Sequence, residues 1–140
     1  MEISKFNSEG YHDPTPYEAL CRIEQQKKTF MPMVYICSAF VGDVRRNKLN
    51  AVRYCRFAVD CGAIPLAPHL FLPQFMSEET ERELAMSMNM VFLSKCRELW
   101  VFGSKVTDGM GREIARAKAR GMPIRYFTEE CERIKRTEDT

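Results

Sequence analysis

One stretch, residues 98–127, constrains the fold of this chain more than any other. It reads ELWVFGSKVTDGMGREIARAKARGMPIRYF. An apolar, β-prone run, Leu99–Phe102, precedes a glycine-rich turn at 103–111, and a segment with helical spacing then runs to Gly121. A second apolar run, Ile124–Phe127, closes the unit. The order strand, turn, helix, strand predicts a βαβ unit, and α/β proteins bind their ligands at such turns.

The segments before this unit repeat the alternation of strands and helices. Met33–Ser38 is an almost continuous apolar run, typical of a parallel strand that is covered on both faces. A helical segment follows from about Val44 to Cys61 and ends at Gly62. Ala63–Ala67 is the next strand, and its Pro65 places it at the sheet edge, because proline cannot donate to a central ladder.

Three further helices are predicted. Ser77 is a good N-cap, so we expect a helix from there to about Lys95. Thr128 caps a predicted last helix, from Glu129 to about Arg136. Ahead of the first strand, a threonine and a proline predict a helix over Tyr17–Lys28, which either packs on the domain edge or mediates self-association.

This alternation predicts an α/β fold with a parallel sheet of about four strands in the order 2-1-3-4 and right-handed crossovers. That order puts a switch point between strands 1 and 3, where the loops 38–43 and 103–108 face one crevice. A length of 140 residues fits one domain. We expect a flexible segment at 1–14, a single domain at 15–136 and a frayed tail at 137–140.

Apolar residues at helical spacing predict the buried helix faces. They are Leu49, Val52, Cys55 and Val59 in one helix, and Leu84, Met88, Val91 and Phe92 in another. Asn89 shares the side of Phe92, so its amide should be at least partly buried and needs partners. The loop at 68–75 either forms a ligand wall or a subunit contact, or tucks Phe71 and Phe75 beneath itself.

Composition excludes several classes of protein. The net charge of +2 is too small to indicate a nucleic-acid partner. No apolar run reaches transmembrane length, and the N-terminus lacks the pattern of a signal peptide. The six cysteines include no C-x-x-C pair, which favours free thiols and a cytoplasmic location. No metal site is expected, since the chain has only His12 and His69 to assist, and no cofactor is indicated.

Glu113 is the candidate for chemistry within the opening stretch. Glycines at 109 and 111 allow close approach of the backbone, and the helix N-terminus offers free N–H groups to an anion or to sugar hydroxyls. The helix dipole is expected to favour an ionised carboxylate, which suits nucleophilic work in glycosyl transfer. The residues alone leave a second interpretation open, in which Glu113 is an ordinary glutamate at the start of its helix.

Three segments together resemble the nucleoside 2-deoxyribosyltransferase superfamily: VYICSAFVGD (34–43), the P-x-A-P-H turn (65–69) and TDGMGREIARA (107–117). The pattern is most similar to a small bacterial and phage branch, related to the 2′-deoxynucleoside 5′-phosphate N-hydrolases. The resemblance covers about Val34 to Phe127. It implies a flavodoxin-like, Rossmann-like fold and a homo-oligomer, a dimer or higher.

The resemblance also implies roles for individual residues. The family's catalytic glutamate, which attacks C1′ of the deoxyribose and expels the base, matches Glu113, and a tyrosine that orients it matches Tyr35. The acid on the helix before strand 3 matches Asn89. Substrate-binding positions correspond to Ser38, Phe40, Gly42, Asp43, His69, Thr107, Asp108, Gly109 and Met110.

Several positions depart from the family pattern. An amide at Asn89 has no titratable proton, so departure of the base loses general-acid help. Ala39 and Val41 replace a serine and an arginine that bind phosphate, which predicts weaker phosphate affinity unless Arg45 or Arg46 substitutes.

The sequence therefore leaves two hypotheses for the function. One is cleavage of an N-glycosidic bond, or deoxyribosyl transfer, on a small nucleoside or nucleotide. The alternative is a non-catalytic module that binds a nucleotide or a nucleotide-derived signal.

Overall fold

The computed structural model describes Pro16 and residues 30–135. The chain divides into two compact units, Met1–Met31 and Pro32–Thr140, and the fold described below is that of the second. The expected flexible segment 1–14, the helix at Tyr17–Lys28 and the tail 137–140 lie outside the described residues.

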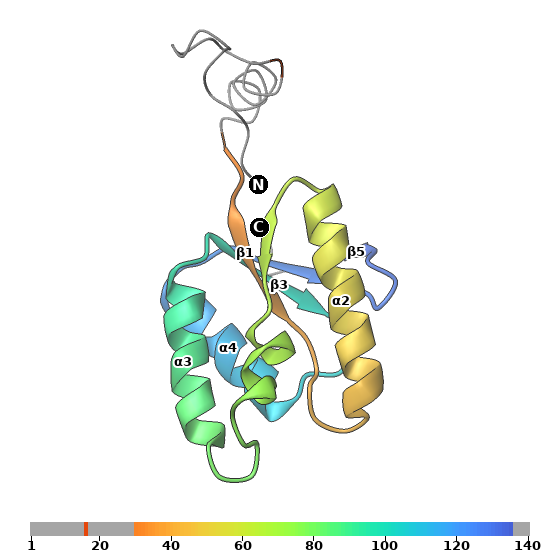
Figure 1. The fold of residues 1–140 in the computed structure, drawn as a ribbon. Helices are drawn as coiled ribbons and strands as arrows, with labels where there is room; N and C mark the ends of the chain where they lie inside the picture. Colours follow the sequence, from red (N-terminus) through yellow and green to blue (C-terminus); the bar gives the residue numbers. More distant parts are fainter. Residues whose placement is uncertain (1–15, 17–29, 136–140) are drawn as a thin grey trace, which may run out of the picture. The chain divides into compact units, whose positions relative to one another are not determined.

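The second unit is a five-stranded sheet in the order β2-β1-β3-β4-β5, with helices on both faces (Figure 1). Its strands are β1 (Met33–Cys37), β2 (Ile64–Leu66), β3 (Glu98–Phe102), β4 (Ile124–Phe127) and β5 (Arg133–Ile134). The pairs formed by β1 to β4 are parallel, and β5 runs antiparallel to β4. The flavodoxin-like fold and the order 2-1-3-4 are therefore confirmed, with one added edge strand.

The helices are α2 (Val44–Asp60), α3 (Arg82–Ser94) and α4 (Asp108–Ala119), and two short 3₁₀ turns, η1 (Pro68–Leu70) and η2 (Leu72–Gln74), follow β2. Strand alternation divides the buried side chains between two layers. Val34, Ile36 and Phe102 lie in one cluster with residues of α2. Tyr35 and Cys37 lie in the other cluster with residues of α3 and α4.

The predicted last helix from Glu129 is wrong. The Thr128 hydroxyl accepts hydrogen bonds from the backbone N–H groups of Glu130 (3.2 Å) and Glu132 (3.1 Å). Cys131 takes a left-handed conformation (φ 66°), and the Thr128 N–H donates to the carbonyl of Glu132 at 2.8 Å. These bonds close a turn that brings β5 back along β4, so the hydroxyl caps a turn and not a helix.

The predicted buried stripe of α2 is also wrong. Leu49, Val52 and Val59 are exposed, Cys55 is half-buried, and the buried residues are Ala51, Tyr54 and Ala58. The two alanines allow the helix to approach the sheet, and the aromatic side chains of the strands fill the remaining space. Spacing alone favoured the larger aliphatic residues, which lie on the other side of the helix.

Helix α3 begins later than predicted and shows a different face. The Ser77 hydroxyl accepts from the N–H of Thr80 in a turn ahead of the helix, and the helix begins at Arg82. Leu84, Met88 and Val91 are exposed, so the predicted face is wrong for these three residues. They form an apolar stripe, here called the α3 stripe.

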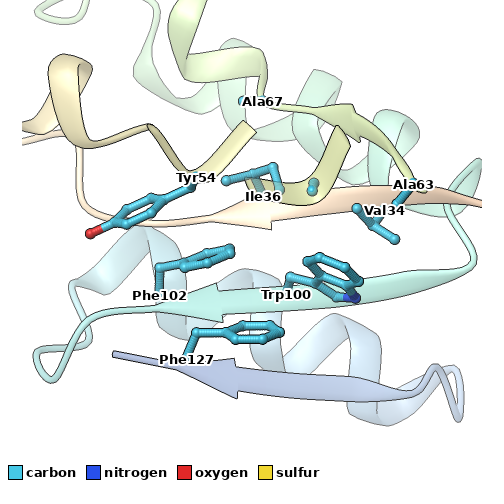
Figure 2. Close-up of a cluster of buried hydrophobic side chains, with 9 residues drawn as sticks. Val34, Ile36, Tyr54, Ala63, Ala67, Trp100, Phe102 and Phe127 are labelled. Atoms are coloured by element: carbon cyan, nitrogen blue, oxygen red, sulfur yellow. The ribbon is translucent and has the colours of Figure 1, made fainter. Parts of the chain in front are cut away.

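Aromatic rings dominate the cluster between α2 and the sheet (Figure 2). The Phe102 ring stacks on Tyr54 at a centroid distance of 4.2 Å and on Phe127 at 4.9 Å. These contacts join α2 to β3 and β4, the two strands of the βαβ unit at 98–127. The Phe102 ring therefore lies at the centre of this layer.

We expect Phe102→Ala to lower the free energy of unfolding by about 3–5 kcal/mol, because it removes a buried ring and leaves a cavity. Urea denaturation followed by circular dichroism measures the change. Phe75→Ala is the matched control: this side chain is 70% exposed, and its loss should stay within about 0.5 kcal/mol. Equal losses in the two variants would contradict this account of the core.

Candidate active site

A cavity lies beyond the carboxyl ends of the central strands. Its empty volume, including the open mouth, is about 680 Å³. Its walls come from the loop after β1, from η1 and η2, from α3 with the segment before it, and from the N-terminus of α4. The lining residues are Ser38, Phe40, Val41, His69, Leu72, Pro73, Glu78, Arg82, Ala85, Met86, Asn89, Thr107, Gly109, Met110 and Glu113.

Glu113 is the buried carboxylate of this cavity. Its side chain is 7% exposed, and no other charged residue in the described part of the chain is buried. The Tyr35 hydroxyl donates to Glu113 Oε2 at 2.6 Å. The contact follows from two periodicities, since strand alternation directs Tyr35 to the α4 side, and Met110, Glu113 and Ala117 form the buried side of α4.

Burial raises the pKa of Glu113 from 4.5 to about 7, although hydrogen bonds from Tyr35 and Cys37 act in the opposite direction. The helix dipole was expected to favour the anion. Glu113 lies in the second turn of α4, beyond the terminal turn where the dipole acts most strongly, so desolvation prevails. The pKa of Tyr35 is raised as well. Burial is the larger cause and the negative charge of Glu113 the next, so this hydroxyl remains a neutral donor.

His69 lies on the wall of the cavity beside the loop after β1. Its Nε2 is 3.1 Å from the Ser38 hydroxyl oxygen, and its ring meets Phe40 edge-on at a centroid distance of 6.5 Å. Burial lowers the pKa of His69 to about 4. The imidazole is therefore neutral near pH 7, where it can accept or donate a hydrogen bond but holds no positive charge.

The glycine-rich turn forms the wall of the cavity next to Glu113. Thr107 is the N-cap of α4, and its hydroxyl accepts from the N–H of Met110 at 3.3 Å. A Cβ added at Gly109 would lie 3.4 Å from the terminal methyl of Met86, so the turn passes close to α3. Thr107, Gly109 and Met110 all reach the cavity.

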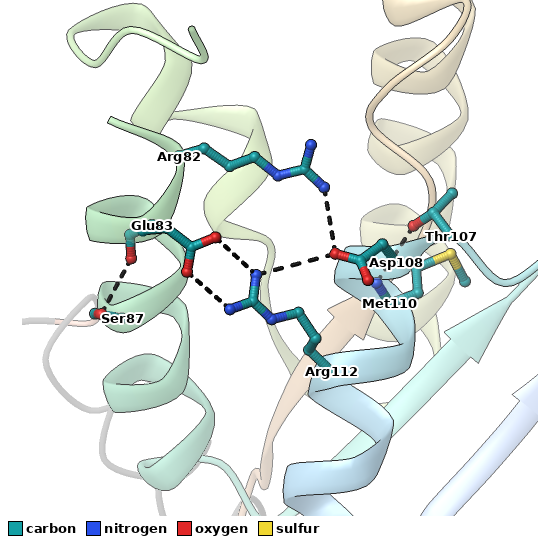
Figure 3. Close-up of polar contacts among 7 residues, drawn as sticks. All are labelled: Arg82, Glu83, Ser87, Thr107, Asp108, Met110 and Arg112. Carbon is teal, nitrogen blue, oxygen red and sulfur yellow. Dashed lines mark hydrogen bonds and ion pairs between the residues drawn. The ribbon is translucent and has the colours of Figure 1, made fainter. Parts of the chain in front are cut away.

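Three predicted substrate residues do not line this cavity. Asp108 forms ion pairs with Arg82 at 3.5 Å and with Arg112 at 4.0 Å (Figure 3). Asp43 caps α2 by accepting from the N–H of Arg46 at 3.2 Å, and it lines a neighbouring cavity. Gly42 has a φ of 100° and turns the loop after β1, which positions the residues that do reach the cavity.

Asn89 reaches the cavity from α3. The residue is half-buried, as expected. Its Oδ1 is buried and has no hydrogen-bond partner in the described part of the chain. The predicted need for a partner is therefore not met by the described residues.

Arg82 is a cavity residue that the sequence did not single out. It lies two helical turns before Asn89 on α3, so the spacing of seven residues places the two side chains on one side of the helix. That spacing of seven residues was the available signal, because both positions lay within the predicted helix, although its N-cap was placed four residues too early, at Ser77 instead of Glu81. Arg45 and Arg46 are exposed and line neither cavity.

Within the described residues, no group of three or more His, Cys, Asp or Glu side chains is arranged to hold a metal ion. The five cysteines in this part of the chain are free thiols, and Cys21 lies outside it. No described helix is long and apolar enough to cross a membrane.

The model of a domain of unknown function, DUF7768, matches residues 32–127. A comparison with curated proteins finds no match. One similar solved structure is a 2-deoxyribosyltransferase from the psychrotolerant bacterium Bacillus psychrosaccharolyticus, characterised as a biocatalyst for the synthesis of antiviral and antitumoral nucleosides. The two chains are 20% identical, with a TM-score of 0.52 over 77% of this chain and 80% of that one. This likeness establishes a shared fold.

The raised pKa of Glu113 predicts a pH-dependent cost to stability. Its pKa is 4.5 when exposed and about 7 in the fold, so the folded chain binds the proton more tightly, and stability falls as pH rises through this interval. Glu113→Gln removes the effect. At pH 8 the variant should therefore be more stable by about 1–3 kcal/mol, with little difference at pH 4.

Thermal denaturation at the two pH values measures this difference. Glu83→Gln is the matched control, because Glu83 is exposed and pairs with Arg112, so its loss should give no gain at pH 8. A Glu113→Gln variant less stable than the wild type at pH 8 would contradict the assigned burial of the charge.

Proposed function

The chain belongs to the DUF7768 family, a domain of unknown function, and we propose that it cleaves the N-glycosidic bond of a deoxynucleoside or deoxynucleotide, or transfers the deoxyribosyl group, through Glu113. The observation that carries this proposal is the buried carboxylate of Glu113, which lines a cavity while Tyr35 holds one of its oxygens at 2.6 Å. The fold shared with a 2-deoxyribosyltransferase supports an enzyme of this class.

In the first step, the Glu113 carboxylate attacks C1′ of the sugar. A C1′–O bond forms, the C1′–N bond breaks, and its electron pair leaves with the base. Tyr35 donates to the carboxylate from a fixed position, which orients the attacking group. Burial strips water from the anion, and a desolvated carboxylate is a stronger nucleophile than a hydrated one.

In the second step, water or the ring nitrogen of a second base attacks C1′. The ester bond to Glu113 breaks, the carboxylate is regenerated, and the proton of the attacking group passes to solvent. Water makes the protein a hydrolase, and an acceptor base makes it a transferase. The cavity has an open mouth, which suits entry of either molecule.

The sugar would lie against the turn of Thr107, Gly109 and Met110, opposite the pair formed by Ser38 and His69. Phe40 offers an apolar ring beside this pair. A 5′-phosphate, if present, has one cation on the cavity wall among the described residues, Arg82. Asp108 already pairs with Arg82, so a phosphate must compete with that carboxylate.

We expect Glu113→Gln to lower release of base by at least about a thousandfold, the scale of loss when a catalytic nucleophile is removed. The assay incubates the protein with a panel of deoxynucleosides and their 5′-monophosphates, with and without an acceptor base, and separates the products by chromatography. In the wild type, the rate should rise as pH passes through about 7, because the carboxylate must be ionised to attack.

Glu83→Gln again serves as the control and should keep the wild-type rate. Release of base at an equal rate by Glu113→Gln would remove Glu113 from the mechanism. If the wild type releases no base from any substrate, the enzyme proposal is wrong.

A binding module is the second candidate, and the missing acid favours it. Asn89 has no titratable proton, and His69 is neutral at pH 7 because burial lowers its pKa to about 4. Calorimetry against a nucleotide panel separates the two candidates. Tight binding without turnover supports the module, whereas turnover that depends on Glu113 supports the enzyme.

We further propose that the protein acts in the cytoplasm as a homo-oligomer, a dimer or higher. The α3 stripe, Leu84, Met88 and Val91, is an exposed apolar face that a second copy would cover. Val91→Glu should therefore lower the mass measured by light scattering after size exclusion, with Ser87→Ala on the same helix as the control. An unchanged mass in Val91→Glu would exclude this face as the interface.

A further inference from the structure

The α3 wall of the cavity carries a hydrogen-bond acceptor that the protein leaves unpaired. Asn89 Oδ1 is buried without a partner, and it is the one side-chain oxygen or nitrogen in the described part of the chain in this state. Burying such an atom costs free energy, and folded proteins seldom keep one without a role. Because Asn89 lines the same cavity as Glu113, its partner is to be sought among the donors of a ligand.

We propose that Asn89 selects nucleobases with a lactam or imide edge, in which a ring N–H stands beside a carbonyl, as in uracil, thymine, hypoxanthine and guanine. Cytosine and adenine, whose edge is an amino group beside a ring nitrogen, would be poor substrates. This inference rests on the proposed function, since it names the class of base that the site would release.

The first part of the argument is the pairing itself. Asn89 Oδ1 accepts from the ring N–H, and the amide nitrogen of the same side chain donates to the neighbouring carbonyl. Two parallel hydrogen bonds then satisfy the buried acceptor and fix the plane of the base. An amino base can also form two hydrogen bonds with an amide, so pairing alone does not discriminate.

The second part is the departure of the base. When the C1′–N bond breaks, the electron pair stays on the base. In a lactam base this charge spreads onto the carbonyl oxygen, where the hydrogen bond from the Asn89 amide strengthens as the charge develops. The amino group of cytosine or adenine feeds electrons into the ring, so departure of these bases depends on a proton from an acid.

The cavity offers no such acid to the base. Its titratable and charged side chains in the described residues are Glu113, His69, Arg82 and Glu78. Glu113 is the nucleophile, and His69 is neutral because burial lowers its pKa to about 4. Arg82 pairs with Asp108 through its guanidinium, which acts as a hydrogen-bond donor and not as a general acid. Glu78 is exposed, so it belongs to the mouth of the cavity. A base that leaves as a stabilised anion fits this arrangement.

The test compares kcat/KM for deoxyuridine and deoxyinosine with that for deoxycytidine and deoxyadenosine. We expect the wild type to prefer the lactam bases by at least about tenfold, the effect of one well-placed hydrogen bond. Asn89→Leu keeps the approximate size and removes both hydrogen bonds, so it should lose that preference. Asn89→Asp supplies a carboxyl group that can carry a proton, so cleavage of the amino bases should rise relative to the wild type at the same pH.

Binding of free bases gives a readout that does not depend on turnover. In Glu113→Gln, calorimetry should detect binding of uracil and hypoxanthine that depends on Asn89. Adding Asn89→Leu should weaken this binding by at least about tenfold, because both hydrogen bonds to the base are lost, and adding Ser87→Ala on the same helix should leave it unchanged. Thermal denaturation of each variant verifies that it is folded.

The outcomes separate the two proposals. Binding of lactam bases that Asn89→Leu weakens, without release of base from any substrate, supports the contact between Asn89 and the base and overturns the enzyme. Release of amino and lactam bases at equal rates by the wild type overturns the selection and leaves the enzyme standing. Absence of binding by any base, or a preference that survives Asn89→Leu, also overturns the selection.

Discussion

The hydrogen bond from Tyr35 to Glu113 depends on nearly every feature of this fold. It joins residues 78 positions apart at 2.6 Å. The parallel pairing of β1 with β3 brings the two elements together, strand alternation directs the tyrosine to the α4 side, and the glycine-rich turn starts α4 above it. A shift of one residue in the β1 register would turn Tyr35 to the opposite layer and leave the carboxylate without this donor.

The burial of polar groups that the proposed chemistry uses also has a cost in stability. Desolvation raises the pKa of Glu113 to about 7, and Asn89 Oδ1 is left without a partner. Glu113 and Asn89 line one cavity. A bound ligand that pairs with Asn89 Oδ1 and with the carboxylate would offset both the missing hydrogen bond and the desolvation of the charge. The core beneath, with Phe102 between two rings, is by contrast well packed. A buried carboxylate and an unpaired amide oxygen in one place on a well-packed scaffold are typical of a binding site.

The sequence predicted the strands of the βαβ unit and the sheet order, because continuous apolar runs and glycines mark parallel strands and their turns clearly. It failed on the helix faces, since apolar residues occur on more than one side of α2 and α3 and only packing decides which side is buried. It also failed on the last segment, where Thr128 closes a turn. Arg82 was missed because the side of α3 that faces the cavity was not predicted, and the N-cap of this helix was placed four residues too early.

An amide and a carboxyl group have nearly the same shape, so an asparagine in the place of an acid keeps the geometry of a cavity wall while it removes a proton. Where a mechanism needs that proton, such a change abolishes turnover; where the leaving group carries its own charge well, the change only narrows the choice of substrate. Neutral His69 and the pairing of Arg82 with Asp108 leave no described cavity group to supply the proton. Under the proposed function, turnover at this site therefore depends on the chemistry of the leaving base.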